Sequence, residues 1–151
     1  MKISIGCDHG GWQLKEELKN YLISNKPVEI IDRGCYSDER CDYPDYGHLV
    51  ANDIKNGECD FGVLICTTGN GINMTANKWK EVRAALCWNS KIAKMARLHN
   101  DANVLTLPGG YISLVESIHC VIEFMDTEFE GGRHENRVKK ISKKKIIKTS
   151  N

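Results

Sequence analysis

The chain has 151 residues, of which 41% are hydrophobic and 27% charged, and its formal net charge is +1. This length suits one domain with a substantial core, and the balanced charge offers no broad surface for nucleic acid or for a membrane. No apolar run approaches the length of a transmembrane helix. The N-terminal stretch MKISIGC is too short for a signal peptide and is followed at once by Asp8. We therefore expect a single cytoplasmic domain spanning residues 1–151.

Short apolar runs alternate with amphipathic segments along the chain. Strands are expected at 2–7, 28–32, 60–66, 82–88 and 102–108, and helices at 11–25, 46–58, 72–80, 89–100 and 113–129. A basic segment from Arg133 to Lys148 closes the chain and could form a last helix. Because the strands are apolar on both faces, they predict a five-stranded parallel sheet covered by helices on both sides, an α/β fold of three layers.

Seven cysteines occur in the chain. Their number is odd and no CxxC spacing occurs, so neither a disulfide framework nor a zinc cluster is expected. Most are interpreted as reduced thiols packed in the core as small hydrophobes. Cys66 is the candidate exception, because it falls where the third strand ends.

Ligands of open α/β sheets bind beyond the carboxyl ends of the strands. Three loops lie there: CDHGG after the first strand, CTTGNG after the third and PGGY after the fifth. In the second loop, Gly69 and Gly71 permit a tight turn and a close approach of backbone to ligand. The helix that follows offers free amide groups suited to an anion or oxyanion, and a thiol beside a helix start is expected to ionise more easily.

The glycine loop has neither the Lys-Ser or Lys-Thr pair of a Walker A motif nor the GxGxxG pattern of dinucleotide-binding folds. From the residues alone, a structural turn that ends in an inert cysteine is therefore about as plausible as a site. Asp8 and His9 end the first strand at the same edge. We favour a functional pair there over a capping Asp followed by a solvent-facing His.

Two further clusters of polar residues are candidate functional sites. His99, Asn100 and Asp101 lie between a helix and the fifth strand, where turn chemistry alone explains them best. Arg133 precedes His134 and lies four residues before Arg137, so the two arginines share a helix face and could grip a phosphate. Two other features are weaker. The run Lys143–Lys145 is interpreted as solvated surface, and Tyr43 is either exposed packing or a substrate contact.

Six segments in register resemble the type B ribose-5-phosphate isomerases, a family that also contains galactose-6-phosphate and allose-6-phosphate isomerases. They are GCDHGG, DYPDY, LICTTGNGI with the following ANK, RAALC, HNDANVL and EGGRHENRV. The likeness runs from the start of the chain to about residue 140. It implies a Rossmann-like α/β/α fold, aldose–ketose isomerisation of a sugar phosphate without metal or organic cofactor, and a homodimer or homotetramer with each active site at a subunit interface.

The resemblance also implies roles for single residues. Cys66 matches the catalytic base of the cysteine-bearing branch, and His99 matches the acid that opens the sugar ring. The substrate-contact positions are Asp8, His9, Tyr43, the loop Thr67, Thr68, Gly69, Asn70 and Gly71, and Asn100, while Arg133 and Arg137 match phosphate contacts. The chemistry suits these groups, because a thiolate can move a proton between adjacent carbons and loop amides can stabilise the enediolate.

Two positions depart from the family pattern. Thr67 follows the base where glycine is common, and Gly110 stands where an arginine commonly serves the phosphate. Ribose 5-phosphate is the favoured substrate, with hexose 6-phosphates as the nearest rivals. A sugar-phosphate binding module remains the alternative outside enzymes, although it would not need Cys66 and His99 together. The missing phosphate-loop pattern disfavours a flavodoxin-like nucleotide binder.

Overall fold

The computed structural model describes residues 1–143, so the end of the predicted basic segment, including Lys144 and Lys145, lies outside the described part. The elements, in chain order, are β1 (Lys2–Cys7), α1 (Trp12–Asn25), β2 (Glu29–Asp32), α2 (Tyr43–Asn56), β3 (Phe61–Cys66), α3 (Asn70–Ala76), β4 (Ala84–Leu86), α4 (Ser90–Asn100), β5 (Val104–Pro108), α5 (Leu114–Asp126) and α6 (Arg133–Ile141).

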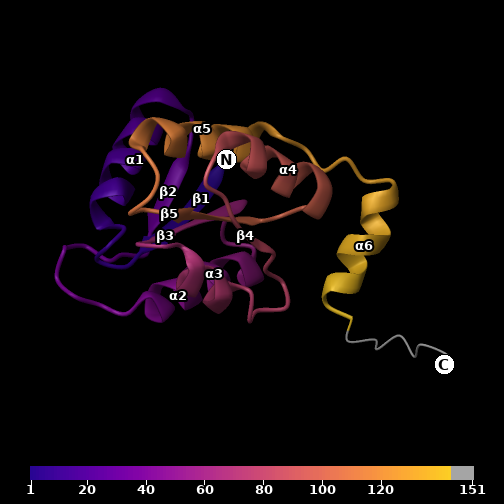
Figure 1. Cartoon of the computed structure of the whole chain (residues 1–151), viewed down its shortest axis with the longest axis horizontal. Coiled ribbons are helices and arrows are strands. Elements are labelled where there is room, and N and C mark those ends of the chain that lie inside the picture. Colours follow the sequence, from indigo (N-terminus) through magenta and orange to yellow (C-terminus); the bar gives the residue numbers. More distant parts are fainter. Residues whose placement is uncertain (144–151) are drawn as a thin grey trace.

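The five strands form one parallel sheet in the order β2-β1-β3-β5-β4. Helices α1, α4 and α5 cover one face, and α2 and α3 cover the other (Figure 1). The predicted three-layer α/β fold is therefore confirmed. Helix α6 stands apart from the sheet, beyond the edge formed by β4 (Figure 1).

The core is split between the two faces of the central strand β3. Val63 and Ile65 belong to a cluster under α1, α4 and α5, while Leu64 and Cys66 belong to a second cluster with Val50 and Ile72 under α2 and α3. Side chains alternate faces along a strand. This alternation turns the Cys66 side chain toward the start of α3.

Two helices begin or end at residues other than those expected, each for a physical reason. Helix α2 begins at Tyr43 rather than Tyr46, because Pro44 fits the first turn of a helix. The expected helix 72–80 is observed at Asn70–Ala76. It stops there because the Asn77 side chain turns to the sheet, where its amide pairs with the N–H and C=O of Ala84, each at 2.9 Å.

A buried carboxylate ties α2 to the sheet. Asp53 is 1% exposed and accepts a hydrogen bond from Ser4 Oγ at 2.6 Å. It also accepts two hydrogen bonds from Arg33, from Nη2 at 2.6 Å and from Nε at 2.8 Å. Burial alone would raise the pKa of Asp53, but the hydrogen bonds from Arg33 and Ser4 outweigh it and lower that pKa. The ionised pair therefore stabilises the fold, fully above the ordinary Asp pKa of about 3.9.

We predict that Asp53→Asn lowers the free energy of unfolding by about 3 kcal/mol at neutral pH, because it removes the buried charge of the pair and leaves Arg33 only the exposed Glu58. Glu58→Gln is the control, since Glu58 meets the same guanidinium at 3.3 Å in solvent and should cost less than about 1 kcal/mol. Urea unfolding measures both. The difference between wild type and Asp53→Asn should shrink as the pH falls through the depressed pKa, and a pH-independent difference would contradict this account.

Candidate active site

Three loops meet at the carboxyl edge of the sheet, as expected. The N–H of Gly109 donates to the Cys66 carbonyl at 2.8 Å, and the N–H of Gly110 donates to the Thr67 carbonyl at 2.9 Å. On the other side of β3, the N–H of Asp8 donates to the Ile65 carbonyl at 3.2 Å. These bonds place the segments that follow β1, β3 and β5 side by side around Cys66.

Cys66 is only 4% exposed, and it lies directly before an exposed loop. Thr67, Thr68 and Asn70 face solvent, while Gly69 is buried with φ at 74°, a left-handed conformation that favours glycine. Helix α3 starts at the next residue, and the first amides of a helix have no partner inside it. The loop therefore presents a thiol and backbone N–H donors to the same edge.

Tyr43 lies against this loop from the start of α2. A Cβ atom added at Gly71 would lie 2.5 Å from the Tyr43 Cζ atom, so the tyrosine ring rests directly on the loop backbone. The side chain is 38% exposed. The structure thus brings Tyr43 and the glycine loop together, and it shows why Gly71 needs to lack a side chain.

Asp8 and His9 are both held in place. Asp8 is 6% exposed, and its Oδ1 accepts a hydrogen bond from the Gly11 N–H at 3.1 Å, which closes the turn before α1, whereas α1 itself has no side-chain cap at its N-cap residue Gly11. Burial raises the pKa of Asp8, although His9 and the backbone donors of the turn oppose the rise. The His9 ring is exposed, and its Nδ1 lies 3.2 Å from the Cys41 N. This contact leaves Nε2 directed away from that loop.

Thr67 fills the space that glycines leave open at this edge. A Cβ atom at Gly10 would collide with the Thr67 hydroxyl, and one at Gly110 would lie 3.0 Å from Thr67 Cγ2. The Thr67 side chain therefore occupies the junction of the three loops. A larger residue at position 110 would have to displace it.

His99 and Asn100 lie elsewhere, in the last turn of α4. The chain leaves that helix through Asp101, whose φ is 46°. Arg83 and Arg97 hold the Asp101 carboxylate at 2.7 and 3.0 Å. Asp101 takes the left-handed conformation and makes the ion pairs that this turn requires. His99 and Asn100 are therefore not needed to form the turn.

The His99 ring stacks on the ring of His134 from α6, with centroids 4.3 Å apart and planes 11° apart. The Glu130 carboxylate lies 3.6 Å from His99 Nε2 and 3.5 Å from His134 Nε2. Burial, together with His99 and Arg133, lowers the pKa of His134. The sequence analysis gave no role to Glu130 or His134, whose i, i+4 spacing was the one signal available.

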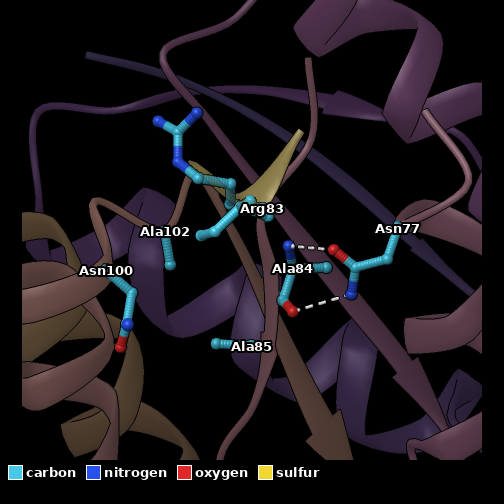
Figure 2. A pocket seen from close by; sticks show the side chains of 7 residues that line it. Asn77, Arg83, Ala84, Ala85, Asn100 and Ala102 are labelled. Carbon is cyan, nitrogen blue, oxygen red and sulfur yellow. Dashed lines mark hydrogen bonds between the residues drawn. The ribbon is translucent and has the colours of Figure 1, made fainter. Parts of the chain in front are cut away.

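Arg133 and Arg137 are exposed on α6, one turn apart. Asn100 borders a nearby pocket of about 270 Å³ between β4, the end of α4 and Ile141 of α6 (Figure 2). None of the residues that line this pocket belongs to the carboxyl-edge loops. The members of this second group thus gather around α6 and not around Cys66.

The expected site residues therefore form two groups. The first group surrounds Cys66 at the carboxyl edge. The second lies around His99 at the amino edge, because α4 runs back across the sheet before β5 begins. The length of β5 alone separates the two edges by roughly 13 Å, so one chain does not bring Cys66 and His99 together.

Four of the other thiols, Cys7, Cys35, Cys87 and Cys120, are buried, while Cys41 and Cys59 are partly exposed. Burial raises the pKa of Cys87 and Cys120 to about 12 and that of Cys59 to about 11. Thiols of this kind are poor nucleophiles. Among residues 1–143, no helix has both the length and the apolar character needed to cross a bilayer.

Comparison with known proteins agrees with the geometry. The family model described as ribose/galactose isomerase matches residues 3–141. Ribose-5-phosphate isomerase B of Escherichia coli K12 is 43% identical over 141 residues, which cover 93% of this chain and 94% of that protein.

Two solved structures have the same fold. The ribose-5-phosphate isomerase B of Clostridium thermocellum is 48% identical, with a TM-score of 0.91 over 94% of this chain and 95% of that one. The Mycoplasma genitalium enzyme, solved with bound ribulose-5-phosphate, is 43% identical, with a TM-score of 0.87 over 93% of each chain. The chain described here belongs to the ribose/galactose isomerase family.

Proposed function

We propose that this protein interconverts ribose 5-phosphate and ribulose 5-phosphate, the step that joins these two sugars in the pentose phosphate pathway. The observation that carries the proposal is the placement of Cys66 at the carboxyl edge, between the Asp8 turn and the glycine loop. The relative from Mycoplasma genitalium, with ribulose-5-phosphate bound, supports the choice of ligand.

The proposed chemistry starts from the open-chain aldose. The Cys66 thiolate removes the proton from C2, and the electron pair forms an enediolate as the C1 carbonyl takes up negative charge. The proton of the C2 hydroxyl passes to the C1 oxygen and the thiol returns the carbon-bound proton to C1, which leaves a carbonyl at C2, a hydroxyl at C1 and the thiolate restored. Amide groups of the loop 67–71 stabilise the charged oxygen, and one such donor is worth about 3 kcal/mol of barrier.

Ring opening and phosphate binding use the remaining residues. His99 protonates the ring oxygen, while Asp8 or Tyr43 takes the proton of the C1 hydroxyl. Arg133 and Arg137 hold the phosphate far from the reacting carbons, and this binding orients the sugar. His9, Asn100 and the loop Thr67, Thr68, Gly69, Asn70 and Gly71 contact the substrate. The reaction needs no metal or organic cofactor, because the thiolate and the imidazole supply the base and the acid.

The functional unit contains at least two chains, as a homodimer or a homotetramer. Cys66 and His99 lie at opposite edges of one sheet, and the reaction needs both at one sugar. The Cys66 group of one subunit therefore faces the α4 and α6 group of its neighbour. The position of α6, apart from its own sheet, suits this arrangement (Figure 1). We place the enzyme in the cytoplasm, with no nucleic-acid or membrane partner.

A hexose 6-phosphate, of allose or galactose, is the second candidate substrate. Gly110 favours it, because its exposed backbone leaves room at the carboxyl edge and carries no charge that would fix a phosphate there. A longer sugar would extend into this space. Thr67 reduces the room on the side nearest the base, and for this reason we favour the pentose.

The direct test is an assay that follows the appearance of ribulose 5-phosphate from ribose 5-phosphate, with a chelator present and no added metal. We expect turnover, and kcat/KM at least tenfold above the values for allose and galactose 6-phosphates. If kcat/KM is higher for one of the hexose 6-phosphates, that sugar replaces ribose 5-phosphate as the proposed substrate. If the protein binds all three sugar phosphates without turnover, it is a sugar-phosphate binding module and not an isomerase.

Cys66→Ser should lower kcat by about 10³-fold, because a serine hydroxyl ionises poorly at neutral pH. Its thermal unfolding should match that of the wild type, since serine is close to cysteine in size. Cys59→Ser, which changes a partly exposed thiol outside both groups of site residues, should keep wild-type activity. Full activity of Cys66→Ser would remove the cysteine from the mechanism.

Mixing two inactive variants tests the shared site. Cys66→Ser keeps the His99 group intact, and His99→Asn keeps the Cys66 group intact. Unfolded together and refolded as a 1:1 mixture, they should recover about a quarter of wild-type activity, because half of the dimers are mixed and each mixed dimer has one complete site. Refolding either variant alone is the control. Absence of recovery in the mixture would show that each chain uses its own residues.

A further inference from the structure

We propose that Glu130 is a positioning residue for His99, holding the imidazole so that it can protonate the sugar ring. The inference rests on the proposed function and extends it to a residue outside the expected site. It follows from how Glu130 is anchored, what its carboxylate faces, and how His134 restricts the His99 ring.

The Glu130 backbone is attached to α4 beside His99. Its N–H donates to the Leu98 carbonyl at 3.0 Å, so the segment between α5 and α6 is fixed next to the last turn of α4. This bond joins residues that are far apart in sequence. It places an acidic side chain beside the one imidazole that the mechanism uses as an acid.

The Glu130 carboxylate faces both imidazoles through one oxygen. Oε2 lies 3.6 Å from His99 Nε2 and 3.5 Å from His134 Nε2. These are ion-pair distances rather than short hydrogen bonds, and such contacts often tighten when substrate binds. A carboxylate in this position can accept a hydrogen bond from His99 Nε2 and so fix the orientation of the imidazole ring.

The His99 ring packs against the ring of His134. The His134 side chain is buried, its N–H donates to the Gly131 carbonyl at 3.0 Å, and Arg133 Nε lies 3.4 Å from its Nε2. The near-parallel stack on His99 limits rotation of the His99 ring. With Nε2 directed to Glu130, Nδ1 is the nitrogen that faces the sugar, as in other sites where a carboxylate orients an imidazole.

The same three ligand atoms lie within 4.8 Å of one another, a spacing that a divalent cation could bridge. Two observations favour the hydrogen-bonded arrangement. The guanidinium of Arg133 approaches the very nitrogen of His134 that a metal would need. The in-plane lone pairs of two nearly parallel stacked rings also lie in two separate planes and do not converge on one point.

The test separates ring opening from proton transfer. Ribulose 5-phosphate has its C5 oxygen esterified, so it cannot close a five-membered ring and is always open-chain. Exchange of its C1 proton with D2O, followed by NMR, needs the base but no ring opening. Consumption of ribose 5-phosphate needs both.

We expect Glu130→Gln to consume ribose 5-phosphate at least tenfold more slowly than the wild type, while its C1 exchange rate stays within about twofold. His99→Asn should show the same split. Glu128→Gln, an exposed glutamate two residues earlier, is the matched control and should keep both rates. The assays are run with a chelator and repeated with added zinc.

Three outcomes would overturn the inference. These are unchanged consumption by Glu130→Gln, an equal loss of consumption and exchange, or wild-type activity that requires the added zinc. The first removes the role, the second indicates a general structural effect, and the third indicates a metal site. If the wild type itself neither consumes ribose 5-phosphate nor exchanges the C1 proton, the proposed function fails instead.

Discussion

The parallel direction of all five strands is the constraint on which the site depends. It brings the ends of β1, β3 and β5 to one edge, where backbone bonds from Gly109 and Gly110 hold the Cys66 loop. It also sends the end of α4, with His99, to the other edge. Under the proposed mechanism Cys66 and His99 serve one sugar only if two subunits share a site, and this topology is the reason for which we propose an oligomer.

In both groups of site residues, the residues that stabilise a turn lie next to the residues proposed for the chemistry. Asp101 takes the left-handed conformation that ends α4 and is held by Arg83 and Arg97, which leaves His99 outside the capping network. Asp8 combines both demands, because its carboxylate closes the turn before α1 while burial raises its pKa. A side chain that is fixed by its own turn loses little freedom on binding substrate, and it is therefore already oriented for catalysis.

Periodicity was enough to predict the fold, because the central strands β1, β3 and β5 are almost continuously apolar and each strand is followed by a helix. It was not enough for α3, where the Asn77 side chain binds Ala84 and ends the helix early. The loops around Cys66 could be found from strand ends alone. Glu130 could not, because its contact with His99 depends on a backbone bond to Leu98, and no local pattern in the sequence encodes that bond.

Thr67 and Gly110, the two positions that the sequence analysis set apart from the family pattern, lie side by side in the structure. The Thr67 side chain occupies the space into which a residue at position 110 would project. A side chain at position 110 would need Thr67 to shift by a few tenths of an ångström, so the residues at these two positions affect each other. Under the proposed function Arg133 and Arg137 supply the charge that binds the phosphate, so we expect phosphate affinity to depend more on α6 of the neighbouring subunit than on the loops around Cys66.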